Sequence, residues 1–385
     1  MPDNKQEIDV EQLTRLRHNL HRNAELSGHE DQTVKIIKDY IQSFQPDEVL
    51  ENIGGKGIAF VFRGKNPGKT IVFRADLDAL PIHEDDGPDY LSENSGISHK
   101  CGHDGHMTIL AGLAELLFNE RIIKGKVILL FQAEEETGTG AEKVVSHSDF
   151  QNLYPDFVFG LHNLPGYQKN TILIKKGSFA AASKGVIIDL KGRSSHAGHP
   201  ENGNNPAIVI SELIQFIKTL NENTGQFEDF TLATVIHIRL GEVAFGTAPG
   251  EAKFMITLRA FSDDDIRRAD EMIRQKTDQV CEIENIKYNI RYTEVFPATI
   301  NHDNEVDIIK NAAEYLQLEC KNIGETFRWS EDFGHYLNHY KGAFFGIGAG
   351  KNTPQLHNPE YDFPDDLITT GIKMFYQIYK RIIAS

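Results

Sequence analysis

The chain has 385 residues and is 40% hydrophobic, so it can bury the cores of two or three domains. Its formal net charge of −16 argues against nucleic acid or an anionic membrane as a partner, because both bind basic surfaces. No apolar run approaches the roughly 18 residues of a membrane-spanning helix.

The N-terminus and the cysteines predict a cytoplasmic location. The first 13 residues, MPDNKQEIDVEQL, contain neither the basic nor the apolar region of a secretory signal. The three cysteines, Cys101, Cys281 and Cys320, are an odd and sparse set that does not suggest a disulfide framework, which fits a reducing compartment.

Four short apolar runs predict the buried strands of a mostly parallel sheet: residues 70–81, 125–136, 155–165 and 341–350. Between them, residues 103–118 carry apolar side chains at helical spacing and predict an amphipathic helix. Strands that alternate with helices in this way indicate an α/β fold with a central sheet between helical layers.

Residues 183–294 predict a separate, smaller domain inserted into the first. Their patterns indicate a strand, a helix, two strands, a helix that begins with DDD, and a last strand. The order β-α-β-β-α-β is that of a ferredoxin-like α+β unit, with GEVAFGTAPG (residues 241–250) as the turn between its middle strands. We therefore assign residues 1–182 and 295–385 to the larger domain and 183–294 to the insert.

Residue types that bind metal lie at the ends of three predicted strands. They are Asp76, Asp78, Glu134, Glu135, Glu136 and His162. Open α/β sheets bind their ligands at the carboxyl ends of the strands, so these side chains are expected at one edge. The three adjacent glutamates follow the apolar run VILLF closely, where they must find cations or repel one another.

The segment ISHKCGHDGHM, residues 97–107, precedes the predicted helix and allows three interpretations. Cys101, His103 and His106 are able to bind metal, Cys101 is able to act as a nucleophile with a histidine as its base, or the segment is a polar turn. Its expected position at the same edge, together with His357 in a polar loop, favours metal. A thiol nucleophile would leave the glutamates and the other histidines without a role.

The donor types indicate which cation is bound. A thiolate, several imidazoles and a carboxylate suit a borderline ion such as zinc, nickel or manganese. A structural zinc site normally has four Cys or His ligands at short spacing, whereas these candidates are scattered, which favours an open catalytic site. Five candidate ligands exceed what one ion with a bound water needs, so we expect two ions about 3.5–4 Å apart.

Seven motifs occur in order along most of the chain: FRADLDALPI, the block from Tyr90 to His106 that ends in CGHDGH, FQAEEETGTGA, GLHNLP, SSHAGHPENGNNP, WSEDFGHY and LHNPEYDF. In kind and in order they resemble the motifs of the aminoacylase/carboxypeptidase G family of dinuclear metallohydrolases. Within that family, the sequence is similar to the branch of hippurate hydrolases, N-acyl-amino-acid amidohydrolases and auxin-conjugate amidohydrolases.

The resemblance implies a role for each residue of the site. The implied ligands of two divalent ions (zinc, manganese, nickel or cobalt) are Cys101, His103, Glu136, His162 and His357. Glu135 matches the family's catalytic base, Asp78 matches an acidic residue that orients a ligand, and His106 matches a supporting or packing position. In an alternative register, one residue earlier, Glu134 and Glu135 would be the base and the ligand.

The resemblance also implies that residues 183–294 form a lid and dimerisation domain, so a homodimer is expected. His196 matches a histidine that stabilises the oxyanion, in its own subunit or its partner, and Arg259 matches an arginine that binds the substrate carboxylate. Two positions depart from the family pattern. Gly246 replaces an asparagine that often contacts the substrate across the dimer, which affects the expected substrate preference, and Ala24 replaces a proline.

Together these features predict a metal-dependent amidohydrolase that uses an activated water to cleave small-molecule N-acyl amino acids with an acetyl-like or benzoyl-like group. A dipeptidase or carboxypeptidase with the same dinuclear site is the alternative, because only the substrate pocket distinguishes the two activities. A binding protein without catalysis would not be expected to keep Glu135 and every candidate ligand.

Overall fold

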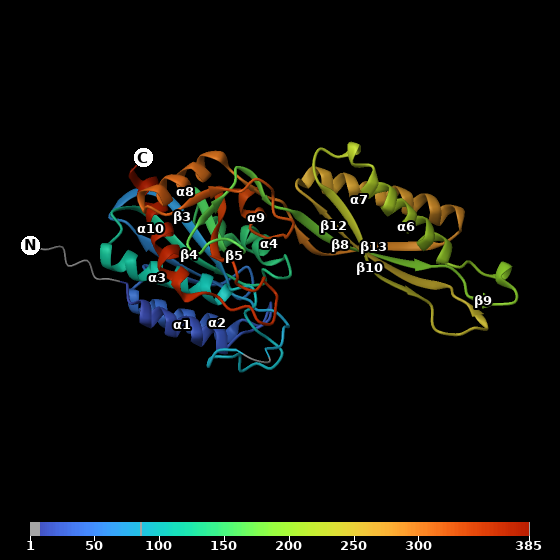
Figure 1. Ribbon diagram of the computed structural model, residues 1–385, viewed down its shortest axis with the longest axis horizontal. Helices are drawn as coiled ribbons and strands as arrows, with labels where there is room; N and C mark the ends of the chain where they lie inside the picture. Colours follow the sequence, from blue (N-terminus) through green and yellow to red (C-terminus); the bar gives the residue numbers. More distant parts are fainter. Residues whose placement is uncertain (1–7, 85–86, 385) are drawn as a thin grey trace, which may run out of the picture. The chain divides into compact units, whose positions relative to one another are not determined.

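The computed structural model describes residues 8–84 and 87–384 (Figure 1). The first seven residues, part of the segment in which no secretory signal is expected, lie outside this range. Contacts among the described residues divide the chain into two compact units. The first contains the chain up to Phe179, Thr299–Glu325 and the chain from Asp332, and the second contains Ala180–Ala298 and Thr326–Glu331. No helix among the described residues combines the length and the apolar composition that crossing a membrane requires.

The first unit is built on an eight-stranded sheet with the order β1-β2-β4-β3-β5-β16-β6-β15 (Figure 1). The strands are β1 (Glu48–Ile53), β2 (Gly57–Arg63), β3 (Asn66–Asp76), β4 (Lys124–Gln132), β5 (Phe157–Pro165), β6 (Ile172–Ile174), β15 (Cys320–Asn322) and β16 (Lys341–Gly350). A separate two-stranded sheet pairs β7 (Gly177–Ala180) with β14 (Thr299–Asn301). The central strands β4, β3, β5 and β16 are parallel, as predicted. The edges add antiparallel pairs that the apolar runs did not predict, β2 with β1 and β4, and β6 with β16.

Helices cover this sheet: α1 (Val10–Arg22), α2 (Asp31–Ile41), α3 (His103–Glu120), α4 (Gly140–Ser146), α5 (Ser148–Gln151), α8 (Asp303–Tyr315), α9 (Gly334–Leu337) and α10 (Ile368–Ala384). Helix α3 confirms the helix predicted at 103–118, and its apolar positions from Met107 to Leu117 are buried. It packs against both α1 and α10, and Gly112 faces Ile372 of α10 with no room for a side chain between them. This packing anchors α3, and the segment before it, to both ends of the chain.

Two strands end earlier than their sequence patterns predict, because the chain turns at the sheet edge. Strand β3 ends at Asp76 and β4 ends at Gln132, several residues before the predicted ends. After β4, Glu134 adopts a left-handed conformation with φ 60°, which turns Glu135 and Glu136 away from the strand direction. Because β3, β4 and β5 are parallel neighbours, the segments that follow them meet at one edge.

The second unit is a four-stranded antiparallel sheet with two helices on one face (Figure 1). Its elements are β8 (Ala182–Lys191), α6 (Ala207–Glu222), β10 (Thr231–Leu240), β12 (Glu251–Ala260), α7 (Asp263–Ile283) and β13 (Lys287–Phe296). The chain order β-α-β-β-α-β and the sheet order β10-β12-β8-β13 are those of the predicted ferredoxin-like fold. Val186, Ile188, Leu213, Phe254 and Ile273 are buried between the sheet and the helices. The predicted insert, 183–294, lies within this unit.

A two-stranded ribbon, β9 (Ser195–His196) with β11 (Thr247–Ala248), replaces the simple turn predicted at residues 241–250. The segments after β8 and before β12 leave adjacent strands, and the Gly192 N–H donates to the Gly250 carbonyl at 2.7 Å. Local pattern does not reveal this pairing, because the two segments are far apart in the chain. His196 therefore lies on the ribbon.

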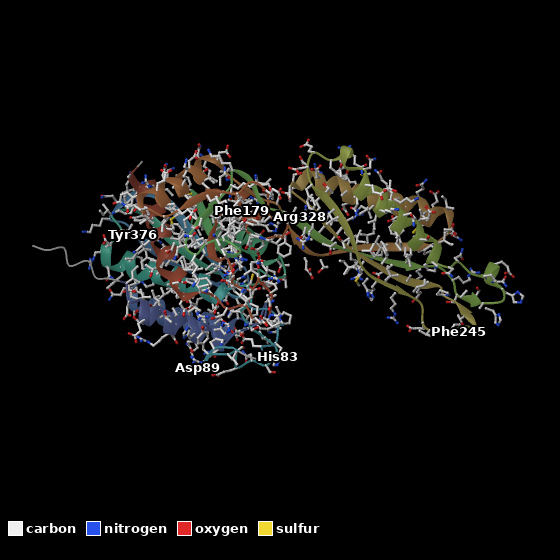
Figure 2. The ribbon with its side chains drawn as sticks, in the orientation of Figure 1. His83, Asp89, Phe179, Phe245, Arg328 and Tyr376 are labelled. Atoms are coloured by element: carbon white, nitrogen blue, oxygen red, sulfur yellow. The ribbon has the colours of Figure 1, made fainter. Side chains whose placement is uncertain are left out.

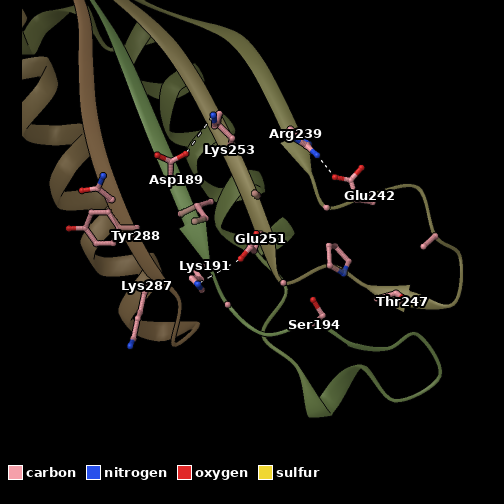
Figure 3. A pocket seen from close by; sticks show the side chains of 18 residues that line it. Asp189, Lys191, Ser194, Arg239, Glu242, Thr247, Glu251, Lys253, Lys287 and Tyr288 are labelled. Atoms are coloured by element: carbon pink, nitrogen blue, oxygen red, sulfur yellow. Dashed lines mark hydrogen bonds and ion pairs between the residues drawn. The ribbon is translucent and has the colours of Figure 1, made fainter.

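The helix-free face of the second unit is hollowed and carries several charged side chains (Figure 3). A cavity of about 770 Å³ lies between the ends of β8, β12 and β13 and the loop after β10. Its charged side chains pair with one another, Arg239 with Glu242 and Asp189 with Lys253. None of the predicted metal ligands lines this cavity, so we do not interpret it as the catalytic pocket.

The parallel core predicts a large difference between two aliphatic truncations around β4. Leu129→Ala removes a fully buried side chain and should lower the free energy of unfolding by about 2–5 kcal/mol. Ile123→Ala, at a side chain that is 60% exposed just before the strand, should change it by less than about 0.5 kcal/mol. Urea unfolding followed by circular dichroism measures both. Equal midpoints for the two variants would contradict the central position of β4.

Candidate metal centre

The structure brings the predicted ligands together at the carboxyl edge of the parallel strands. Three overlapping sets of side chains have candidate ligand atoms within 4.8 Å of one another: Cys101, His103 and His162; His103, Glu135 and Glu136; and Cys101, Glu136 and His357. They come from the segment before α3 and its first residue, the turn after β4, strand β5 and the loop before α10. All of them belong to the first unit.

The distances between these donors fit shared cations. Cys101 Sγ lies 3.4 Å from His162 Nε2, and Glu136 Oε1 lies 3.8 Å from His103 Nε2 and 3.8 Å from His357 Nε2. Ligands bound at about 2.0–2.3 Å to one cation lie roughly 3–4 Å apart. His103 Nε2 and Glu136 Oε1 are buried and have no hydrogen-bond partner among the described residues, although buried polar atoms normally have one. The donor set therefore fits divalent cations.

Burial shifts the pKa values of three donors in the cluster. Burial raises the pKa of the Cys101 thiol well above its usual value and also raises the pKa of Glu136. It lowers the pKa of His162, so this imidazole is neutral. A divalent cation favours the thiolate and the carboxylate and binds neutral imidazole, so it would reverse the first two shifts and retain the third.

Asp78 supports the cluster through its backbone as well as its side chain. The Asp78 carbonyl lies 2.8 Å from His103 Nδ1, which places the proton on Nδ1 and leaves Nε2 facing the cluster. The Asp78 carboxylate accepts hydrogen bonds from the Glu136 N–H at 3.0 Å and the Ser27 hydroxyl at 2.6 Å. Asp78 therefore contacts two candidate ligands, His103 through its carbonyl and Glu136 through its carboxylate.

His106 contacts supporting residues through both of its nitrogens. Its Nδ1 lies 2.7 Å from Asp76 Oδ1, and its Nε2 contacts the side-chain oxygen of Asn163. Through these contacts His106 joins the end of β3 to β5. The Asp76 carboxylate also accepts a hydrogen bond from Arg74 at 2.8 Å, so Asp76 links His106 to Arg74.

Asn163 is a supporting residue that sequence reasoning missed. Its side-chain N–H groups donate to the Cys101 carbonyl at 3.1 Å and to the Tyr361 hydroxyl. It also lies beside Gly102, which has φ 93° and leaves no space for a Cβ against the amide of Asn163. The signal in the sequence was its place directly after His162, in the motif GLHNLP.

The three adjacent glutamates separate into two environments. The Glu134 carboxylate accepts a hydrogen bond from the Thr139 hydroxyl at 2.9 Å and pairs with Lys143. Glu135 Oε2 and Glu136 Oε1 instead lie 4.0 Å and 3.8 Å from His103 Nε2. This geometry separates Glu134 from the donor cluster and leaves Glu135 and Glu136 beside it.

Comparison with known proteins identifies the family. The sequence pattern of peptidase family M20/M25/M40 matches residues 72–381. The chain belongs to this family. The resemblance inferred from the seven motifs is thereby confirmed, and so is the α/β fold with a second, smaller unit.

Two relatives and one solved structure describe what this M20 chain is similar to. An N-acetyl-L-cysteine deacetylase of Bacillus subtilis is 30% identical over 377 residues, 97% of this chain and 89% of the relative. A hippurate hydrolase of Campylobacter jejuni is 29% identical over 369 residues, 95% of each chain. The structure of a dinuclear metal-binding M20 peptidase of Bacillus subtilis has a TM-score of 0.83 and 25% identity, covering 97% of this chain and 98% of the other.

Family membership and the donor cluster together define the enzyme class. This M20 chain is a metal-dependent hydrolase of amide bonds, and its site fits the dinuclear centre that was expected.

The two remaining predicted residues, His196 and Arg259, belong to the second unit. His196 is exposed on β9, where its Nδ1 accepts a hydrogen bond from the Gly198 N–H at 3.0 Å. Arg259, on β12, donates to the Arg328 carbonyl at 2.8 Å and to the Ser330 hydroxyl at 3.1 Å. Neither side chain is part of the donor cluster in the first unit.

The two departures from the family pattern have visible local consequences. The Gly246 carbonyl accepts a hydrogen bond from the Ala197 N–H at 2.9 Å, so this backbone position helps to join the two segments of the ribbon. The Ala24 N–H donates to the His21 carbonyl at 3.3 Å, a hydrogen bond that a proline at this position could not make. Neither residue contributes a metal ligand.

A buried carboxylate near the cluster gives a prediction for pH dependence. Glu30 precedes α2, and its Oε1 accepts a hydrogen bond from the Glu134 N–H at 3.0 Å. Its Oε2 is buried and has no hydrogen-bond partner within residues 8–84 and 87–384. Burial, assisted by the Asp78 carboxylate, raises the pKa of Glu30 from 4.5 to about 7. The charged form is therefore disfavoured in the folded protein.

The sign of the Glu30 effect follows from this raised pKa. The stability that Glu30 contributes is fully present below the pKa of this side chain in the unfolded protein. It is lost as the pH rises through the pKa in the folded protein, about 7. In the metal-free protein, Glu30→Gln should therefore gain roughly 1–3 kcal/mol of stability over the wild type as the pH rises from about 5 to about 8. Asp31→Asn, at the adjacent exposed carboxylate, should show no such trend in the same pH series of urea unfolding. Parallel pH profiles for Glu30→Gln and wild type would contradict this prediction.

Proposed function

We propose that this M20 chain hydrolyses N-acyl amino acids to a carboxylic acid and a free amino acid. The observation that carries the proposal is the donor cluster of Cys101, His103, Glu136, His162 and His357, with Glu135 beside it. The names of the two relatives, a deacetylase of N-acetylcysteine and a hydrolase of hippurate, support acetyl-like and benzoyl-like acyl groups. A dipeptidase or carboxypeptidase would use the same site, and these relatives favour the N-acyl substrates.

The mechanism assigns proton transfer to Glu135. Two divalent cations, held by the five donors, would supply Lewis acidity and lower the pKa of a water molecule towards about 7. Glu135 is buried, and its Oε2 lies 4.0 Å from His103 Nε2, so it borders the donor cluster. There it accepts the proton of the attacking water and then transfers it to the nitrogen of the leaving amine. Asp78 keeps His103 and Glu136 in place through the hydrogen bonds described above.

The second unit contributes the groups that contact the substrate. His196 Nδ1 accepts a hydrogen bond, so its proton lies on Nε2, which can donate to the oxyanion of the tetrahedral intermediate. The Arg259 guanidinium is oriented by the Arg328 carbonyl and the Ser330 hydroxyl, and it binds the carboxylate of the amino-acid part. Residues 183–294 thus act as the lid.

The proposed assembly is a homodimer formed through residues 183–294. Strand β10 is at the edge of its sheet, and Ile236 and Ile238 on it are exposed. The loop that follows carries Val243 and Phe245, whose side chains are 97% and 99% exposed, with Phe245 near its tip (Figure 2). An apolar edge strand left uncovered favours association with another chain, and a second copy offers the same surface.

The ribbon places His196 next to this proposed dimer surface. Strand β11, which pairs with β9, directly follows the loop that carries Phe245. We therefore propose that His196 acts on the substrate bound to the partner subunit.

The three cysteines are free thiols, which supports the proposed cytoplasmic location.

The proposed function predicts a substrate preference and two distinct glutamate phenotypes. After chelation and restoration with zinc, manganese, nickel or cobalt, the enzyme should hydrolyse N-acetyl and N-benzoyl amino acids faster than dipeptides. Glu135→Gln should lose at least about 10²-fold in kcat because the proton acceptor is gone, while it keeps its metal. Glu136→Gln should lose metal. Steady-state kinetics and elemental analysis measure these outcomes.

Three results would contradict parts of this proposal. Full activity without any metal would exclude the mechanism. A preference for dipeptides would support the peptidase alternative. Exchanged phenotypes for Glu135→Gln and Glu136→Gln would assign the two roles the other way round, and Glu134→Gln serves as the matched control that should keep both metal and activity, because its carboxylate contacts Thr139 and Lys143.

Action across the dimer predicts complementation between two inactive variants. His196→Ala should lower kcat without changing metal content, because the residue lies outside the donor cluster. When His196→Ala is mixed with Glu135→Gln, a mixed dimer contains one site with both groups intact, so activity should reappear. Subunit exchange is verified independently with differently tagged chains. Continued inactivity after proven exchange would exclude action in trans, and a fully active His196→Ala would remove the residue from the mechanism.

A further inference from the structure

The short segment that carries Cys101 and His103 is flanked by two buried charged side chains. Lys100 precedes the two candidate ligands and Asp104 follows them, and both side chains are buried. Neither has a role in the mechanism above. Buried charges are unfavourable unless they are paired, so the partners of Lys100 and Asp104 show what holds this segment.

Lys100 connects the start of the segment to two other parts of the first unit. Its Nζ lies 2.5 Å from Glu84 Oε1 and donates to the Tyr361 carbonyl at 2.8 Å. Its backbone carbonyl accepts a hydrogen bond from the His357 N–H at 2.8 Å. The segment before Cys101 is therefore joined to the loop that carries a third candidate ligand.

Asp104 connects the end of the segment to helix α1. Its Oδ2 lies 2.7 Å from His21 Nδ1 and 3.2 Å from an Arg17 nitrogen, and both of these residues are on α1. Its Oδ1 accepts a hydrogen bond from the Gly105 N–H at 2.9 Å, within the first turn of α3. The segment after His103 is thus anchored to the N-terminal helix.

His21 joins the two ends. Its Nε2 lies 3.0 Å from Glu84 Oε1, the same oxygen that contacts Lys100. The contacts Lys100–Glu84–His21–Asp104 therefore close a ring around residues 101–103, which we call the ligand-loop clamp. Although burial opposes both shifts, hydrogen bonds with Asp104 and Glu84 raise the pKa of His21 to about 9, and those from His21 and Lys100 lower the pKa of Glu84 to about 2, so charge alternates around the ring.

We propose that His21 and Glu84 are positioning residues of the metal centre, which hold residues 100–104 so that Cys101 and His103 face the cation before it binds. The inference rests on the proposed function only in requiring that the site binds metal. Neither residue touches a candidate ligand, and both act through Lys100 and Asp104. A loop that is ordered before binding loses less conformational entropy on binding, and residues behind metal ligands commonly contribute to affinity for this reason.

A neighbouring histidine on the same helix provides a matched control. His18 Nε2 lies 3.0 Å from Asp365 Oδ2, and its ring stacks on Tyr90 at 3.6 Å. It thus makes a histidine–carboxylate contact on α1 like that of His21, but outside the ligand-loop clamp. Because His18 lies outside the ring, the clamp makes only His21 important for metal affinity.

The test is a titration of the metal-free, full-length protein with Co²⁺ at neutral pH. The variants are His21→Asn, Glu84→Gln and the control His18→Asn, all compared at a temperature at which circular dichroism shows them folded. Affinity is measured by competition with a chelator, and the thiolate-to-cobalt absorption band, which Cys101→Ser should abolish, reports the geometry at Cys101. His21→Asn and Glu84→Gln should each weaken Co²⁺ binding by about 10- to 100-fold and alter this band, and His18→Asn should change neither.

The outcomes separate the clamp from the metal site itself. Unchanged affinity and absorption in both His21→Asn and Glu84→Gln would overturn the clamp and leave the proposed function intact. A wild-type protein that binds no Co²⁺ would overturn both. If His21→Asn does not fold, Glu84→Gln decides alone, because it preserves the shape of the side chain. The double variant should lose no more affinity than either single variant, because breaking one contact of the ring already frees residues 100–104. Additive losses of affinity would overturn the ring.

Discussion

A thiol, two carboxylates and three imidazoles lie close together at one sheet edge, where His357 is the exposed member of the six. Only positive charge can offset the cost of holding the others in their metal-binding forms. The raised pKa values of Cys101 and Glu136 are consequences of this constraint, and so are the atoms of His103 and Glu136 that lack a hydrogen-bond partner in the described part of the chain. The parallel strands are what create it. Because β3, β4 and β5 run side by side in one direction, the polar residues that end them arrive at the same edge.

Support for the cluster extends outward in connected layers. Asp78 holds His103 and Glu136, while His106 and Asn163 hold the strand and loop on the other side. Farther out, the ligand-loop clamp ties the segment of Cys101 and His103 to α1. Each layer uses hydrogen bonds between buried groups, which limit how far the donors can move when no cation balances their charge.

The two units divide the proposed work. The first unit contains every candidate ligand and Glu135, whereas the second contains His196 and Arg259. This division suits a hydrolase whose chemistry depends on a rigid donor set and whose substrate contacts must form and break in each cycle. In the proposed assembly, the exposed apolar strand β10 contacts the partner, and the ribbon beside it carries His196.

The sequence by itself determined the features that depend on local pattern. Apolar runs and helical spacing identified the central strands, α3 and the ferredoxin-like order of the second unit, because burial periodicity is a property of short segments. The donor types of Cys101, His103, Glu136, His162 and His357 indicated a borderline cation for the same reason, since ligand chemistry belongs to the residue itself. The family motifs then related these positions to one another across most of the chain.

Only the tertiary structure decided which distant residues meet. It showed that Glu134 faces Thr139 and Lys143 while Glu135 and Glu136 face His103, a distinction made by one left-handed residue after β4. It replaced the turn at residues 241–250 with a ribbon that carries His196, and it revealed the positions of Asn163 and of the ligand-loop clamp. These features are contacts between segments far apart in the chain. No local pattern encodes them, because the free energy of each contact depends on which distant residues the fold brings together.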